Sequence, residues 1–265
     1  MRGKRDLILA AMRERGRVIV AFSGGVDSSL VLKLAKDALG EGCLAVIADS
    51  PTLPRRELEA AKRMAGEMGA RLEVLRLRET ERKDYMENSG LRCYYCRSEL
   101  GRELKAFAAS RGFSTVADGA NASDLGDYRP GLKAADENGF WHPLIEFGIT
   151  KDMVRTMAAE LGLSWFDKPS SPCLSSRIMT GEPITLEKLM MIETGEDMLH
   201  DMGFRLVRVR SIGGSARIEV SKQDVPRLTD ASIYKEVESE LRGLGFRSVT
   251  VDNEGYRQGN MNKRV

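Results

Sequence analysis

A β-branched run, followed at once by a glycine-rich turn and an apolar helix, constrains this chain more than any other feature. Residues 17–20, Arg-Val-Ile-Val, have the composition of a buried strand, and residues 30–35 supply the apolar side of a helix. Between them, residues 23–28 read Ser-Gly-Gly-Val-Asp-Ser. Glycines let the backbone approach an anion, and the free N–H groups of a first helical turn point at it. The segment therefore predicts a phosphate-binding loop.

The loop belongs to neither of two common nucleotide motifs. No Gly-Lys-Ser/Thr follows the glycines, as a Walker A sequence requires, and G-x-G-x-x-G is absent. A glycine turn that only packs a helix on a strand is disfavoured, because strand, turn and helix all occur in order. The sequence resembles the pyrophosphate loop of the ATP pyrophosphatases, a superfamily that includes GMP, NAD and asparagine synthetases and tRNA thiolases. The resemblance implies ATP cleavage between the α and β phosphates, with Asp27 helping to place magnesium.

Alternation of strands and helices predicts an α/β fold for residues 1–170. Further strands are expected at residues 43–48, 72–75 and 114–117, with helices at about 54–69 and 99–111. This order favours a doubly wound, Rossmann-like parallel sheet of the adenine nucleotide alpha hydrolase type, with helices on both faces. Ligands of such sheets lie beyond the carboxyl ends of the strands, where the polar residues around Asp49 and Asp118 are expected.

A second, smaller α+β domain is predicted for residues 171–265. A proline-rich, irregular stretch at residues 168–173 precedes it. Helices are then expected at about 185–202 and 232–244, and strands at 205–210, 216–220 and 246–251.

Composition limits the classes of partner. Of the 265 residues, 42% are hydrophobic and 30% charged, as in a globular protein that binds no membrane, and the net charge of +2 gives no general case for nucleic-acid binding. Four cysteines without an export signal favour a cytoplasmic protein with reactive or metal-bound thiols.

Three of the cysteines suggest a metal site. Cys93 and Cys96 form a C-x-x-C pair, expected in a polar loop before a helix, and Cys173 is the third candidate. Zinc normally takes four ligands, and no second pair or nearby histidine supplies them. Three thiolates can hold a [4Fe–4S] cluster with one iron open to another ligand. The alternative, small buried side chains, is reasonable for Cys43 at a strand start.

Other polar residues have two readings each. Asp118 and Asn121 suit ribose or magnesium binding, or an Asx turn. Arg129 is expected at the same crevice as a partner for phosphate or carboxylate. Arg208 and Arg210 share one strand face, which the pattern alone predicts to be solvated, the alternative being a phosphate clamp. The acidic residues of the preceding helix are either cation ligands or a common acidic surface: Glu193, Glu196 and Asp197.

The order of these segments between residues 18 and 220 resembles the LarE family of ATP-dependent sulfur transferases. Arg129-Pro130-Gly131 and residues 173–177, Cys-Leu-Ser-Ser-Arg, carry that assignment. The family acts on pyridinium-3,5-biscarboxylic acid mononucleotide in nickel-pincer cofactor biosynthesis. The resemblance implies MgATP-dependent adenylation of a carboxylate, followed by attack of sulfur on the acyl carbon. It also implies a homo-oligomer.

The resemblance assigns roles residue by residue. The ATP site would comprise Ser23, Gly24, Gly25, Asp27, Ser28, Asp49, Asp118, Asn121 and Arg129. The substrate site would comprise Ser176 and Arg177, with Arg208 and Arg210 on the substrate phosphate, and Glu196 is a candidate metal ligand. Because Cys93, Cys96 and Cys173 are all present, we predict the cluster type, which would receive sulfide from an external donor.

Four alternatives remain open. The cysteine matching Cys173 gives up its own sulfur in some family members. A cluster-dependent tRNA thiolase also joins a pyrophosphate loop to three cysteines, although near-neutral charge disfavours it. An ammonia-using synthetase lacks its glutaminase domain here. A non-catalytic protein that senses ATP or carries sulfur would have the same binding motifs.

Overall fold

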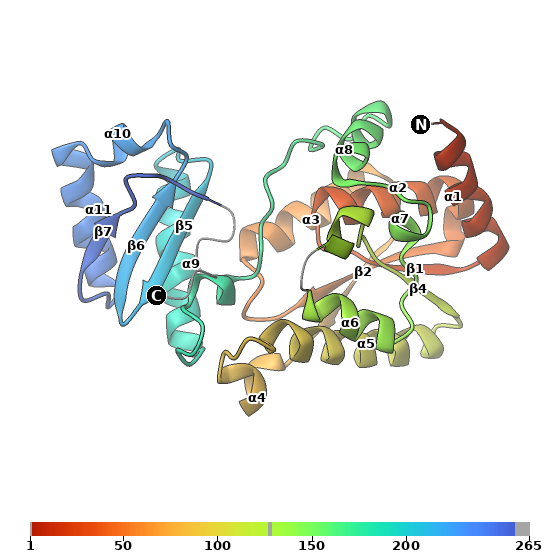
Figure 1. Ribbon diagram of the computed structural model, residues 1–265, viewed down its shortest axis with the longest axis horizontal. Coiled ribbons are helices and arrows are strands. Elements are labelled where there is room, and N and C mark those ends of the chain that lie inside the picture. The colour runs from red at the N-terminus through yellow and green to blue at the C-terminus, as the bar shows by residue number, and fades with distance from the viewer. Residues whose placement is uncertain (1, 127–128, 258–265) are drawn as a thin grey trace. The chain divides into compact units, whose positions relative to one another are not determined.

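A parallel four-stranded sheet carries the phosphate-binding loop, in the computed structural model shown in Figure 1. The strand order is β3-β2-β1-β4, with all neighbours parallel. The strands span β1 (Val18–Ala21), β2 (Cys43–Asp49), β3 (Leu72–Arg76) and β4 (Thr115–Ala117). The order reverses between β1 and β4, which creates a topological switch point at their carboxyl ends. The predicted α/β fold is confirmed.

Alternate residues of β1 and β2 build a core on each face of this sheet. Val18 and Val20 pack with Ala45 and Ile47 in one core, which receives residues of α1, α2, α3 and α8. Ile19 packs in the other core, with residues of α5 and α6. Figure 1 shows these two groups of helices on opposite sides of the sheet. The helices are α1 (Arg2–Arg15), α2 (Val26–Leu39), α3 (Arg55–Glu67), α5 (Arg92–Ser110), α6 (Pro130–Glu137), α7 (Pro143–Glu146) and α8 (Lys151–Glu160).

A separate three-stranded sheet forms the core of the C-terminal part. Strand β6 pairs antiparallel with β5 and parallel with β7. The elements are η4 (Leu174–Arg177), α9 (Leu186–Asp201), β5 (Val207–Ile212), β6 (Ser215–Val220), α10 (Val225–Leu228), α11 (Ala231–Gly243) and β7 (Val249–Val251). The Thr185 side chain caps α9 by accepting from the Lys188 N–H (3.2 Å). The predicted small α+β unit is therefore present, with β5 two residues later than expected.

The chain divides into two compact units, and the structure describes residues 2–126 and 129–257. Unit 1 comprises Met1–Glu79 and Cys93–Ser171, and unit 2 comprises Thr80–Arg92 and Pro172–Val265. The predicted boundary after residue 170 lies one residue from the second crossing. The sequence did not reveal that Thr80–Arg92, with its short helix α4 (Lys83–Met86), belongs to unit 2.

Candidate functional site

The glycine-rich loop joins β1 to α2 and is braced by its own hydroxyl groups. Ser28 Oγ donates to the Gly25 carbonyl (3.1 Å) and accepts from the Ser23 N–H (3.2 Å). Gly24 has a φ of +70°, and a Cβ on it would lie 2.9 Å from Cβ of Ala61 in α3. Since the first N–H groups of α2 have no acceptor within the helix, the loop and α2 provide donors suited to an anion.

The turn after β4 packs directly against this loop. A Cβ on Gly119 would lie 2.5 Å from the backbone nitrogen of Ser28, so only glycine fits there. Asn121 Nδ2 donates to Asp27 Oδ1 (3.0 Å), and Asp124 Oδ2 accepts from the Asn121 N–H (3.0 Å). The geometry thus joins the strand-end residues of β1 and β4 that the sequence analysis singled out.

Two carboxylates lie together at this switch point. Burial raises the pKa of Asp27 above its ordinary value, and the neighbouring Asp124 charge raises it further. Arg129 pairs with Asp124 (2.9 Å). No group of three or more potential ligands from His, Cys, Asp and Glu occurs among the described residues. The donor set therefore fits Mg²⁺ held by one or two carboxylates together with nucleotide phosphates, and it provides no complete all-protein site.

Asp118 is the centre of a buried network that the sequence did not reveal. Its carboxylate accepts from the Ala120 N–H (3.0 Å), from Arg97 and from His142 Nδ1 (2.6 Å). His142 Nε2 contacts Asp136 Oδ1 (3.0 Å). Burial alone would raise the pKa of Asp118, but the His142 hydrogen bond and the Arg97 charge outweigh burial and lower it. Burial likewise opposes protonation of His142, but the hydrogen bond and charge of Asp118 raise its pKa.

The C-x-x-C pair lies in the first turn of α5, and the predicted loop is wrong. The expected helix over residues 99–111 begins instead at Arg92. Cys93 is exposed and Cys96 is half-buried. Residues three apart share a helix face, so the two thiols are neighbours. The backbone of Cys93 packs against α6 at Gly131, while Arg97, one residue beyond Cys96, reaches Asp118.

Two further charged residues lie at the strand ends and loop of unit 1. Asp49, at the end of β2, forms an ion pair with Arg55 of α3. Lys168 Nζ donates to the Gly24 carbonyl (3.2 Å) and to Glu57 Oε2 (2.7 Å). Lys168 therefore ties the end of unit 1 to the phosphate-binding loop.

In unit 2, Arg177 holds the backbone around Cys173. Its guanidinium donates to both carboxylate oxygens of Glu196 (2.9 and 2.9 Å). Nη1 also donates to the carbonyls of Pro172 (2.5 Å) and Cys173 (3.1 Å) and to the Ser176 hydroxyl (3.0 Å). Arg177 is fully buried, so its direct contacts are with the protein, and it fixes the Cys173 peptide.

Glu196 has several hydrogen bonds within unit 2. Besides accepting from Arg177, its Oε1 accepts from the Val209 N–H (3.0 Å). A metal ion at Glu196 would have to share these oxygens, and that role stays a prediction.

Arg208 and Arg210 are not on a solvated strand face, and that interpretation is wrong. Each is only 5% exposed. Arg210 pairs with Glu219 (2.7 Å) and donates to the Ser176 carbonyl (3.0 Å). Burial lowers the pKa of Arg208, and the nearby Arg177 charge lowers it further. With the carboxylates of Glu196 and Glu219, this cluster joins three guanidinium groups to two carboxylates, an excess of positive charge suited to an anion.

The four cysteines all lie in the described part of the chain, and none forms a disulfide there. Cys43 is buried, as expected, and burial raises the pKa of its thiol to about 12, so it is inert. Cys93 and Cys96 belong to unit 1, whereas Cys173 belongs to unit 2.

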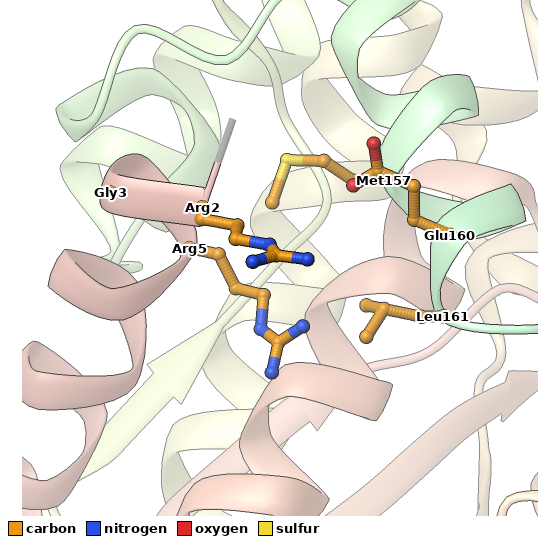
Figure 2. Close-up of a pocket in the computed structure, with 6 residues that line it drawn as sticks. All are labelled: Arg2, Gly3, Arg5, Met157, Glu160 and Leu161. Carbon is orange, nitrogen blue, oxygen red and sulfur yellow. The ribbon is translucent and has the colours of Figure 1, made fainter.

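A cavity of about 710 Å³ lies away from these residues, between α1 and the end of α8. Figure 2 shows the side chains of Arg2 and Arg5 together with Met157, Glu160 and Leu161. It contains none of the strand-end residues. Among the described residues, no helix is long and apolar enough to cross a membrane.

The fold and the loop define an ATP-using enzyme of the PP-loop class, and comparison with known proteins agrees. The NAD synthase family profile matches residues 7–89. The chain is 38% identical over 261 residues to "Pyridinium-3,5-bisthiocarboxylic acid mononucleotide synthase" of Lactiplantibacillus plantarum, covering 98% of this chain and 94% of that protein. It is 42% identical over 250 residues to the uncharacterized protein slr1717 of Synechocystis, covering 94% and 93%. A 61-residue match, 43% identical, links it to a glutamine-hydrolyzing GMP synthase of Archaeoglobus fulgidus, covering 22% of this chain and 20% of that one.

The chain belongs to the family of pyridinium-3,5-bisthiocarboxylic acid mononucleotide synthase, the LarE family that its motifs resemble.

Proposed function

We propose that this enzyme is an ATP-dependent sulfur transferase that converts a carboxylate of pyridinium-3,5-biscarboxylic acid mononucleotide into a thiocarboxylate. The observation that carries the proposal is the phosphate-binding loop braced by the β4 turn, in a chain 38% identical to the synthase named for the thiolated product. A carboxylate is a poor electrophile, so it must be activated before sulfur can replace its oxygen.

The residues of unit 1 suit the activation step. The loop Ser23, Gly24, Gly25 and Ser28 would bind the departing pyrophosphate through backbone N–H groups. Asp27 would hold Mg²⁺, which neutralises phosphate charge when bound and thereby relieves the repulsion from Asp124. Asp49, Asp118, Asn121 and Arg129 would orient the nucleotide at the strand ends. AMP is then joined to the substrate carboxylate, and pyrophosphate leaves.

The buried arginines of unit 2 suit the substrate phosphate. Arg208 and Arg210 would bind it, because their cluster with Arg177 has more guanidinium groups than carboxylates. Ser176 would line the same site.

For the sulfur source, we propose the three-cysteine set Cys93, Cys96 and Cys173. A [4Fe–4S] cluster held by three thiolates leaves one iron open for a sulfide supplied by an external donor. The neighbouring thiols of Cys93 and Cys96 in α5 fit two of these ligand positions. The segment that packs beside Cys173 in unit 2 ends at Arg92, the residue immediately before Cys93. We further propose a cytoplasmic homo-oligomer.

Pyrophosphate release tests the reaction class. With MgATP alone the enzyme should release little pyrophosphate, and adding the dicarboxylate nucleotide should start release. Release that is independent of this nucleotide would contradict the proposal and favour an ATP-binding sensor. Tight binding of bulk tRNA in a filter assay at moderate salt would favour a tRNA thiolase instead.

Anaerobic reconstitution tests the sulfur source. The wild type should bind about four iron and four sulfide ions per chain. Cys93→Ala and Cys173→Ala should each abolish this, whereas Cys43→Ala should not. A colourless wild type whose Cys173 loses hydrogen sulfide after turnover, as seen by mass spectrometry, would instead establish sacrificial donation.

A further inference from the structure

The segment Thr80–Arg92 belongs to unit 2, and it packs on the turn that carries Cys173. Tyr85 of α4 is 1% exposed, and its hydroxyl lies 2.7 Å from Ser175 Oγ. Ser175 has no exposed surface and follows Cys173 by two residues in η4. A buried hydroxyl pair that loses one member leaves the other without its partner, which is costly in a protein interior.

Asn88 fixes the other end of this segment. It is the one residue besides glycine with a positive φ (53°) in the described ranges, and it is fully buried. Its amide nitrogen donates to the carbonyls of Met179 (2.9 Å) and Glu182 (2.9 Å). Its amide oxygen accepts from Arg92 Nη1 (2.5 Å). A left-handed backbone at a buried residue is retained when its surroundings hold it, as these bonds do.

Arg92 completes the contact with the cysteine turn. The same Nη1 donates to the Ser175 carbonyl (2.9 Å), so Tyr85 and Arg92 together bind Ser175 by its hydroxyl and its backbone. From the other side, Arg177 binds the carbonyls of Pro172 and Cys173. The backbone is thus held before and after Cys173, while its side chain stays partly exposed.

We propose that Tyr85, Asn88 and Arg92 are positioning residues for Cys173, and we call the segment Thr80–Arg92 the latch. The latch fixes the turn so that the Cys173 sulfur occupies one place, whether it binds a cluster or donates its own sulfur. The functional part of this inference rests on the proposed sulfur transfer. The positional part does not, because it concerns the mobility of the turn alone. A 1 Å misplacement of a reacting group costs a large factor in rate.

The first experiment measures the reactivity of Cys173 in the full-length, reduced and chelator-treated protein. Iodoacetamide alkylation is followed by peptide mass spectrometry, with Cys93 and Cys96 as internal references. In Tyr85→Phe and in Ser175→Ala, local opening of the turn should raise the Cys173 rate at least about threefold relative to those references. The double variant should add little, because each single variant breaks the same contact. Unchanged rates in both single variants would overturn the proposal.

Tyr234→Phe is the matched control. The Tyr234 hydroxyl of α11 donates to the Val249 carbonyl (2.8 Å), a comparable hydrogen bond in the same unit. Its loss should lower the melting temperature to a similar extent without changing Cys173 alkylation. An equal rise in both Tyr→Phe variants would show a general loosening of unit 2 and contradict a specific latch.

The second experiment separates the latch from the proposed reaction. Tyr85→Phe should lower the thiocarboxylate formed per pyrophosphate released, with KM for ATP unchanged. Higher alkylation with full sulfur yield would show that the latch does not position Cys173 for chemistry. If the wild type itself transfers no sulfur, the proposed function fails, and alkylation still decides whether the latch holds the turn.

Discussion

Individual residues decide whether the phosphate-binding loop has its shape. Gly24 and Gly119 bring the loop against α3 and the β4 turn, at separations that a Cβ would occupy. Gly24 was predictable, because it belongs to a recognisable motif. The tight contact of Gly119 was not, since it depends on which strand lies beside β1. His142 reaches Asp118 because Trp141 pairs with Ala117 at the end of β4, a long-range bridge without a local signal.

Gly119→Ala should disrupt the loop. The added methyl would lie 2.5 Å from the Ser28 nitrogen and 2.9 Å from the Asp27 carbonyl carbon, both of them backbone atoms. We expect a loss of about 1–3 kcal/mol in the free energy of unfolding. ATP affinity, measured by calorimetry, should fall about tenfold or more. Gly66→Ala in α3, where nothing lies within 4 Å, is the control; equal ATP binding by both variants would contradict this account.

The Asp118–His142 pair should make stability depend on pH on both sides. The pKa of His142 is raised on folding, so its contribution is complete below about 6.5 and is lost as pH rises through the folded value. The pKa of Asp118 is lowered, so its contribution is complete above about 3.9 and is lost as pH falls through its folded value.

His142→Gln therefore tests the alkaline side. The difference in free energy of unfolding between wild type and variant should shrink as pH rises above about 6.5. Urea denaturation at several pH values measures it. His200→Gln should lack this trend, because the His200 ring pairs with the Phe204 carbonyl rather than with a carboxylate. A His142→Gln difference that is constant with pH would exclude the pair as the cause.

At the scale of elements, hydrophobic period and caps predicted most of what folds locally. Strands β1, β2 and β4 and helix α9 lie within two residues of their predicted bounds, because apolar spacing and Thr185 mark them. Helix α5 begins seven residues before its predicted start, because its polar first turn shows no apolar face. Helix α8 and the latch were missed, since the latch depends on distant contacts such as Tyr85 with Ser175.

Glu196→Ala should destabilise the junction of η4, α9 and β5. It leaves the fully buried Arg177 guanidinium without its carboxylate, and such loss costs about 3–5 kcal/mol. Chemical denaturation followed by a probe in unit 2 would measure it. Glu236→Ala, which removes an exposed carboxylate of α11, should change stability by no more than about 0.5 kcal/mol. Equal effects of the two substitutions would contradict a structural role for the Arg177–Glu196 pair.

At the scale of the whole molecule, two units divide the chemistry that we propose. Unit 1 carries the phosphate-binding loop with Cys93 and Cys96, and unit 2 carries Cys173 and the buried arginines. The sequence predicted both units and most candidate residues, because PP-loop and cysteine motifs are local. Which segments exchange between units was not predictable, because the latch reaches unit 2 only through tertiary contacts.

Mass spectrometry of the substrate tests the central claim most directly. The enzyme is incubated with MgATP, a sulfide source and pyridinium-3,5-biscarboxylic acid mononucleotide, and with each component omitted in turn. The account predicts a product in which sulfur replaces a carboxylate oxygen, formed only with ATP and together with AMP and pyrophosphate. Loss of Cys173 should abolish the product. Unchanged substrate under conditions where pyrophosphate is released, or thiolation without ATP, would contradict it.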